Sequence, residues 1–304
     1  MPNFFHPLSL MLLWSNAMTR VDHSVKNAAK NFVESRRTKN GGYAGRRNSS
    51  DIYYTSFAVR ALVILGESPD SFDNAFRQYL REQQENLSNG AELSAYLSTM
   101  TLLDMPLSQD WCRNAWERFR RADGCFASSD SSRYSSTYHT FLAASCFALF
   151  DDDESIASIP AAAILSRQRD DGGFVELPPL RHSGTNPTAA AMGFLALRGA
   201  ETDDFSSVKQ FLLRRQLADG GFQAHSRAPV SDLLSSFSAF LSLKSMRAQN
   251  ECRRDLLKDY VIRCRQRTGG YVGGAWDAEP DIEYTFYGLA LEGLFAEPLA
   301  EPPS

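Results

Sequence analysis

Two kinds of helical pattern alternate along the chain. In residues 207–216, Val208 and Phe211 share an apolar face and Arg214 is expected to face solvent, as in a helix that lies at a protein surface. Residues 54–65 are apolar on nearly every face, which is typical of a helix buried on all sides. No stretch alternates with the period of two that marks a half-buried strand. The pattern predicts an all-α protein with an inner ring of apolar helices inside an outer ring.

Pairs of glycines followed by an aromatic residue recur between these helices. The pairs begin at Gly41, Gly172, Gly220 and Gly269. The last three are 48 and 49 positions apart, and two weaker copies fit earlier, near Asn89-Gly90 and at residues 123–126. Glycine ends a helix and permits left-handed backbone angles. A fixed period of this length predicts about six stacked helical hairpins in one domain.

A glutamine precedes three of these glycine pairs. Gln168 and Gln216 stand four positions before their glycines, and Gln266 stands three before. We expect the amide to bond free backbone groups at the neighbouring helix end, which is a structural role.

Composition and charge exclude several classes of protein. The 304 residues are 43% hydrophobic and 22% charged, with a net charge of -4, so a globular protein without affinity for nucleic acid is expected. Five scattered cysteines without a Cys-x-x-Cys pair indicate reduced, packed thiols and a cytoplasmic location.

The two ends of the chain are expected to lie outside the repeats. Residues 8–14 are apolar but too short to span a bilayer, so the protein is not expected to be transmembrane. They predict a first packing helix within a helical lead-in, residues 1–29. The proline-rich tail, residues 296–304, is expected to fray.

The Gln-x-x-x-Gly-Gly-aromatic units resemble the repeats of squalene cyclases and protein prenyltransferase β-subunits, across residues 30–295. The resemblance implies an α/α toroid (an α6/α6 barrel) around a central cavity. Triterpene cyclases carry two toroids and an Asp-x-Asp-Asp acid, whereas the acidic run at residues 151–154 is expected to start a helix here. The β-subunits, and the geranylgeranyl type II group among them, are the nearer likeness. They imply an isoprenoid diphosphate, a helical α-subunit and an acceptor protein as partners.

One segment is similar to the prenyltransferase motif Gly-Gly-Phe-Gln-Gly-Arg-x-x-Lys-x-x-Asp-x-Cys. Residues 220–234 match it with a loop one residue longer, and His225 and Arg227 fall near the positions that hold the diphosphate in the family. Positive charge there would stabilise the departing oxygens. The alternative is that both are ordinary polar loop residues.

The family's zinc ligands are mostly absent. Asp232 matches the motif's aspartate, but Leu234 replaces the cysteine and Tyr284 replaces the histidine of the last repeat. Leucine cannot bind a metal and tyrosine is a poor zinc ligand. We therefore expect no zinc and no other cofactor, and we keep Asp232 and Tyr284 as the candidate catalytic residues.

Further candidates lie on the apolar helices. His139 stands in the same column as Tyr54 and Tyr284, where it could contact the diphosphate or be a hydrogen-bonded core residue. Aromatic residues are expected to line the cavity and bind substrate, among them Tyr54, Phe57, Phe237, Tyr284 and Tyr287. Asp281 and Glu283 could form an acid/base pair or simply favour a helix start, and His182 is a further loop candidate.

Three functions compete on this basis. The first, which we predict, is a diverged prenyltransferase β-subunit-like protein that binds an isoprenoid diphosphate in the central cavity and could transfer the prenyl group. The second is a terpenoid cyclase-like enzyme that acts without zinc. The third is a non-catalytic toroid for protein interaction, in which aromatic side chains fill the cavity.

Overall fold

The computed structural model describes residues 3–200 and 205–296. Within them, six apolar helices form an inner ring: α3 (Ile52–Ile64), α5 (Gly90–Leu102), α7 (Thr137–Ala148), α10 (Thr185–Leu197), α12 (Leu233–Ser245) and α14 (Ile282–Ala296). The outer ring consists of α2 (His23–Ser35), α4 (Asn74–Gln83), α6 (Gln109–Glu117), α8 (Asp153–Ser158) with α9 (Ala161–Leu165), α11 (Ser206–Leu213) and α13 (Arg254–Cys264). A 3-10 turn, η1 (Pro69–Ser71), and an antiparallel pair, β1 (Phe222–Gln223) and β2 (Ser231–Asp232), complete the ring.

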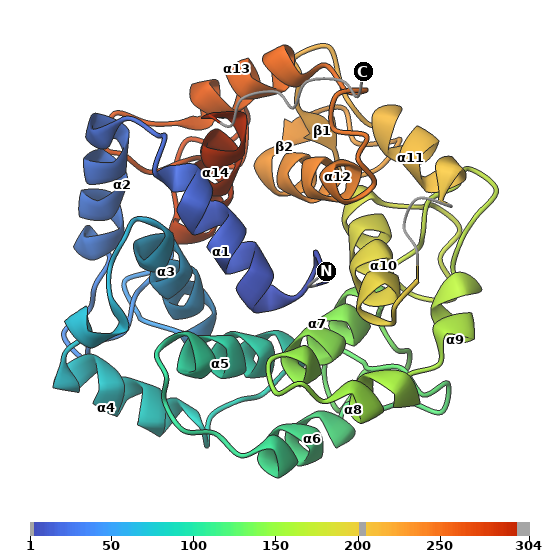
Figure 1. Ribbon diagram of the computed structural model, residues 1–304, viewed down its shortest axis with the longest axis horizontal. Coiled ribbons are helices and arrows are strands. Elements are labelled where there is room, and N and C mark those ends of the chain that lie inside the picture. Colours follow the sequence, from blue (N-terminus) through green and yellow to red (C-terminus); the bar gives the residue numbers. More distant parts are fainter. Residues whose placement is uncertain (1–2, 201–204, 297–304) are drawn as a thin grey trace.

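The inner helices close into a ring. Each packs on the next in chain order, and α14 returns to pack on α3 (Figure 1). The outer helices lie around them, and large side chains fill the space between the rings, including Phe76, Trp116, Phe174, Phe211 and Phe222. The predicted α/α toroid is therefore confirmed. The tail at residues 297–304 lies outside the described residues, and α2 already begins at His23, inside the segment expected as a lead-in.

A recurring hydrogen bond fixes where the inner helices begin. The backbone N–H of the aromatic residue after the glycines donates to a hydroxyl on the fourth residue of the following inner helix. The pairs are Tyr43 to Thr55 (2.9 Å), Phe126 to Thr140 (3.1 Å), Phe174 to Thr188 (2.9 Å), Phe222 to Ser236 (2.9 Å) and Tyr271 to Thr285 (3.1 Å). Because a buried N–H without a partner is costly, this bond makes each glycine turn part of the helix start.

The glycine turns also contact the next outer helix. Gly220 has a φ of +94°, and a Cβ at that position would lie 2.1 Å from the Leu256 carbonyl oxygen. Gln216 Nε2 donates to the Gly220 carbonyl oxygen (2.9 Å) and to that of Arg253 (3.1 Å), and Gln216 Oε1 accepts from the Arg253 N–H (2.9 Å). The structural role expected for this glutamine is confirmed.

Helix α1 (Pro7–Met18) crosses the middle of the ring (Figure 1). Before its start, His6 Nε2 lies 2.9 Å from the Ala148 carbonyl oxygen at the end of α7. At its other end, Ala17 packs beside Gly293, near the end of α14. The predicted packing helix thus covers the opening at the carboxyl ends of the inner helices. No helix in the described ranges is long and apolar enough to cross a membrane.

Candidate functional site

A chamber of about 420 Å³ lies at the centre of the ring, between the inner helices and α1. Its wall is mainly apolar and rich in aromatic residues, namely Phe5, Trp14, Tyr53, Phe57, Tyr138, Phe141, Phe237, Phe286 and Tyr287. Helix α1 forms one end of it, where the Trp14 ring lies 5.2 Å from that of Phe286 and 5.7 Å from that of Phe237. The centre of the ring is therefore filled at one end and hollow over the rest.

A carboxyl group lines the other end of the chamber. The hydroxyl groups of Tyr53 and Tyr287 both donate to Glu283 Oε1, at 2.9 Å and 3.1 Å. Burial raises the pKa of Glu283, and the two hydroxyl groups oppose this effect only in part. Glu283 lines the chamber together with aromatic rings, among them Phe57, which packs 5.4 Å from the ring of Tyr287. The result is an acid held in an apolar environment.

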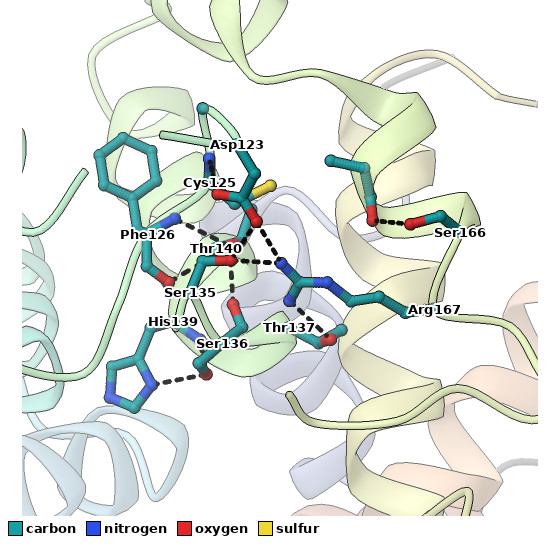
Figure 2. Close-up of polar contacts among 12 residues, drawn as sticks. Asp123, Cys125, Phe126, Ser135, Ser136, Thr137, His139, Thr140, Ser166 and Arg167 are labelled. Atoms are coloured by element: carbon teal, nitrogen blue, oxygen red, sulfur yellow. Dashed lines mark hydrogen bonds and ion pairs between the residues drawn. The ribbon is translucent and has the colours of Figure 1, made fainter. Parts of the chain in front are cut away.

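A second carboxyl group, that of Glu176, lines the chamber near the start of α7. Ser136 caps that helix and donates its hydroxyl to Glu176. Burial raises the pKa of this carboxyl as well. Ser136 also contacts the His139 ring at 2.9 Å (Figure 2). Burial lowers the pKa of His139 to about 4, so the imidazole is neutral at neutral pH and carries no charge to attract an anion.

The start of α7 is also tied to a buried arginine (Figure 2). Arg167 is 1% exposed, and its guanidinium lies 3.2 Å from Asp123 Oδ2 and 3.1 Å from Thr137 Oγ1, and also bonds Ser135. Asp123 in turn accepts from the Cys125 N–H (3.1 Å), so the cluster links the third glycine turn to α7 and α9. This cluster is structural and does not line the chamber.

The residues in place of the family's zinc ligands do not fit a zinc ion. Asp232 caps α12 with both oxygens, since Oδ1 accepts from the Ser235 N–H (2.6 Å) and Oδ2 from the Ser235 hydroxyl (2.7 Å). Leu234 lines the chamber, and the Tyr284 ring lies under Arg46 at 5.8 Å. In the described ranges, no group of three or more His, Cys, Asp or Glu side chains could hold a metal.

Arg46 is a cation beside this position, and it forms ion pairs with two aspartates. Its Nη1 lies 3.0 Å from Asp277 Oδ1 and its Nε lies 3.1 Å from Asp281 Oδ2. Asp281 also caps α14 by accepting from the Tyr284 N–H at 2.9 Å. Burial raises the pKa of Asp281 despite the neighbouring guanidinium. The amino-terminal ends of α12 and α14 thus carry more acidic groups than basic ones.

The predicted site residues divide into three groups. Phe57, Phe237 and Tyr287 line the chamber, as does Glu283. Tyr54, Asp232, Tyr284 and His139 lie at or before the first turn of inner helices, outside the lining. His225, Arg227 and His182 are exposed loop residues. The catalytic and binding roles assigned to them remain predictions.

The five cysteines and the acidic run have structural positions. All five thiols are buried and free, and burial raises the pKa of Cys146, for example, to about 11. In the acidic run, Asp152 caps α8 by accepting from the Ser155 N–H at 3.1 Å, as expected for a helix start. Asp152 is also buried and bonds Arg113 through both oxygens, at 2.6 and 2.7 Å.

The sequence profile of the family described as "Prenyltransferase alpha-alpha toroid domain" matches residues 3–92 and 75–299, so the chain belongs to this family. It is a prenyltransferase β-like protein of the toroid superfamily. The β-subunit of geranylgeranyl transferase type-1 from Arabidopsis thaliana is 28% identical over 145 residues, which cover 44% of this chain and 38% of that protein. The match therefore spans well under half of the relative's length.

Several solved structures share the fold, and two of them illustrate the range of relatives. Protein geranylgeranyltransferase-I of Candida albicans, solved in complex with GGPP, superimposes with a TM-score of 0.70 at 17% identity, covering 89% of this chain and 90% of that one. The type II terpene cyclase MstE from Scytonema gives a TM-score of 0.61 at 13% identity, covering 93% and 98%. Both lines of similarity, to a transferase and to a cyclase, concern proteins that act on isoprenoids.

Proposed function

We propose that this protein binds the hydrocarbon chain of an isoprenoid in its central chamber, as a diverged relative of prenyltransferase β-subunits. The observation that carries the proposal is the chamber itself: about 420 Å³, with walls rich in aromatic side chains. This volume falls within the range of roughly 300–1,000 Å³ that small-molecule sites occupy. Transfer of apolar surface from water to such a wall supplies the binding free energy.

A diphosphate head group is the finer part of the prediction. His225 and Arg227 lie in the exposed loop between β1 and β2, close in sequence to α12, and would have to supply its positive charge. The charges at the ends of α12 and α14 work against them, because Asp232, Asp281 and Glu283 are acidic and Arg46 is already paired. A prenyl diphosphate remains the first ligand to test, and Tyr54 and His139 the further residues predicted to contact it.

Transfer to an acceptor is the next level of the proposal. Cysteine alkylation of the family type is the least favoured chemistry, because the residues present do not fit the zinc ion that would activate the thiol. Asp232 and Tyr284 are the residues predicted to take part in any transfer. A helical α-subunit, an acceptor protein and a cytoplasmic location belong to the same proposal.

One observation favours a second function, cyclisation of an isoprenoid by acid. The Glu283 carboxyl group lines the aromatic chamber and its pKa is raised by burial, which favours the protonated form that can donate a proton. Glu283 would give this proton to one carbon of an alkene and leave a carbocation on the other, which aromatic faces stabilise. The π electrons of a second alkene in the chain would then attack this carbocation, which forms the C–C bond of the ring and moves the positive charge to a carbon of the second alkene. Loss of a proton from a neighbouring carbon back to the Glu283 carboxylate would end the reaction with the substrate's atoms conserved.

Calorimetric titration with geranylgeranyl diphosphate and with geranylgeraniol tests the binding proposal. We expect one ligand per chain, with binding at least about tenfold weaker in Ala190→Phe, because this buried side chain lines the chamber. Thermal unfolding of the variant controls for misfolding. Absence of binding of both ligands to the wild-type chain would refute the proposal. Mass spectrometry of the incubated lipid separates the two chemistries, since cyclisation gives a product of unchanged mass.

A further inference from the structure

Arg60 is the only charged residue in α3, a helix that is otherwise apolar or neutral, and its side chain lines the chamber. Tyr53 and Phe57 precede it on the same face of the helix, at spacings of seven and three residues. Since a helix rises about 1.5 Å per residue, Arg60 lies about 10 Å deeper than Tyr53 and its bond to Glu283. The chamber therefore has carboxyl groups at one end and a guanidinium toward the other.

No carboxylate in the described part of the chain pairs with Arg60. Its Nη2 donates to the Ser98 hydroxyl at 2.8 Å, and its Cζ lies 5.2 Å from the centre of the Phe57 ring. By contrast, the partly or fully buried Arg46 and Arg167 both have an aspartate partner. Arg60 is half-buried against apolar groups, and an anion would compensate the cost of removing its charge from water. Arg60 thus has four remaining N–H groups for such an anion.

Neighbouring helices add hydrogen-bond donors at the same depth. Ser98 lies in the third turn of α5, where its hydroxyl donates to the Ala95 carbonyl oxygen at 3.1 Å and would have to rotate away from it to meet an anion. Ser145 lies seven residues after Tyr138 on the lining face of α7. The Ser145 hydroxyl makes no hydrogen bond to another described side chain. Three inner helices therefore present a guanidinium and two hydroxyl groups to one region of the chamber. This is a donor set for a single anionic group such as a carboxylate.

We propose that Arg60, with Ser98 and Ser145, binds the carboxylate of an isoprenoid monoacid whose hydrocarbon chain runs along the aromatic wall toward Glu283. This proposal rests on the proposed function and names its ligand class. One guanidinium matches a monoanion in charge, whereas a diphosphate carries more negative charge than this site can compensate. The orientation places the polar head deep in the chamber and the hydrocarbon tail toward the starts of the inner helices.

Titration of the full chain with geranylgeranoic acid and with geranylgeraniol, at about pH 7.5 where the acid is ionised, tests the proposal. We expect the acid to bind the wild-type protein at least about tenfold more tightly than the alcohol. In Arg60→Gln the affinity for the acid should fall by about tenfold or more, while the affinity for the alcohol should stay within about twofold of the wild-type value. Retained alcohol binding shows that the variant is folded. Arg81→Gln, an exposed arginine on α4, is the matched control.

The outcomes separate this proposal from the one it rests on. If acid and alcohol bind equally, or if Arg60→Gln leaves their ratio unchanged, the Arg60 site is overturned while the isoprenoid proposal stands. The same holds if geranylgeranyl diphosphate binds best and depends on His225 and Arg227 but not on Arg60. If neither lipid binds the wild-type chain, the proposed function fails and takes the Arg60 site with it.

Discussion

The Tyr53 hydroxyl donates a 2.9 Å hydrogen bond to Glu283 Oε1, and this contact joins the first inner helix of the ring to the last. Tyr287 donates to the same oxygen at 3.1 Å. The bond that helps to close the ring thus also holds the acid of the chamber. Stability and chemistry are coupled at this point, because any change in the charge of Glu283 affects both.

The stability of the protein should depend on the ionisation of Glu283. Its pKa in the folded state is raised above the ordinary value of 4.5, first of all by burial. Its contribution is therefore fully present below about pH 4.5 and is lost as the pH rises through the raised value. Glu283→Gln stays neutral, so we expect its free energy of unfolding, relative to wild type, to increase between about pH 5 and about pH 8.

Urea denaturation across this range measures the difference. The matched control is Glu279→Gln, an exposed acid just before α14, which should show no such trend. Each unit by which the pKa is raised corresponds to about 1.4 kcal/mol. A difference between Glu283→Gln and wild type that stays constant with pH would contradict this account of the carboxyl group.

Helix α1 should contribute to stability chiefly through Trp14. This side chain is 6% exposed, and its indole N–H has no hydrogen-bond acceptor in the described residues, so its role is packing. We expect Trp14→Ala to lower the free energy of unfolding by about 3–5 kcal/mol and to enlarge the chamber. Leu12→Ala, on the same helix but 65% exposed, should change it by less than about 0.5 kcal/mol. Equal effects of the two in denaturant titrations would show that α1 does not pack into the ring as described.

The fold could be predicted from the sequence, but the position of α1 could not. The period of the glycine pairs gives the number of hairpins, and the apolar helices identify the inner ring, because both patterns follow from burial in a closed array. Residues 8–14 are apolar, so the sequence predicts that they pack against the protein but does not indicate which surface they cover. Only the tertiary structure places them across the opening of the ring, where they define one end of the chamber.

The first glycine of a pair should be highly sensitive to substitution where it touches the next outer helix. In Gly220→Ala, strain at a φ of +94° adds to a contact of 2.1 Å with the Leu256 carbonyl oxygen, and we expect a loss of more than about 3 kcal/mol. Gly66 has a similar φ of +102°, but no atom lies within 4 Å of the position that a Cβ would take, so Gly66→Ala isolates the strain, at about 1–2 kcal/mol. Chemical denaturation of both variants gives the comparison, and a Gly220→Ala loss no larger than that of Gly66→Ala would contradict the contact.

The buried cluster around Arg167 should be a structural anchor of the ring. Arg167→Met leaves Asp123 and Thr137 without their charged partner, and we expect a loss of about 2–4 kcal/mol in the free energy of unfolding. Arg81→Met, at an exposed position of α4, is the control and should be nearly neutral. Lipid binding by folded Arg167→Met should be unchanged, because Arg167 does not line the chamber; a selective loss of binding at unchanged stability would contradict the structural role.

The candidate site could be predicted only in part, for a physical reason. Aromatic residues such as Phe237 and Tyr287 are identified by position on apolar helices, because the faces of a closed inner ring point either to the outer ring or to the centre. Ion pairs such as Arg46 with Asp277 join residues 231 positions apart, and no local pattern reveals them. Arg60 could be singled out from the sequence, because it is the only charged residue in a helix that is otherwise apolar or neutral. That it has no carboxylate partner among the described residues is known only from the structure.

The central claim, that the chamber holds an isoprenoid chain, is tested most directly by photo-crosslinking. A geranylgeranyl probe that carries a diazirine is irradiated with the full-length protein, and the labelled peptides are mapped by mass spectrometry. We expect labels on chamber residues of α1, α12 and α14, such as Trp14, Phe237 and Tyr287, and their loss when excess geranylgeraniol competes. Labels confined to exposed outer helices, or unaffected by the competitor, would contradict the claim.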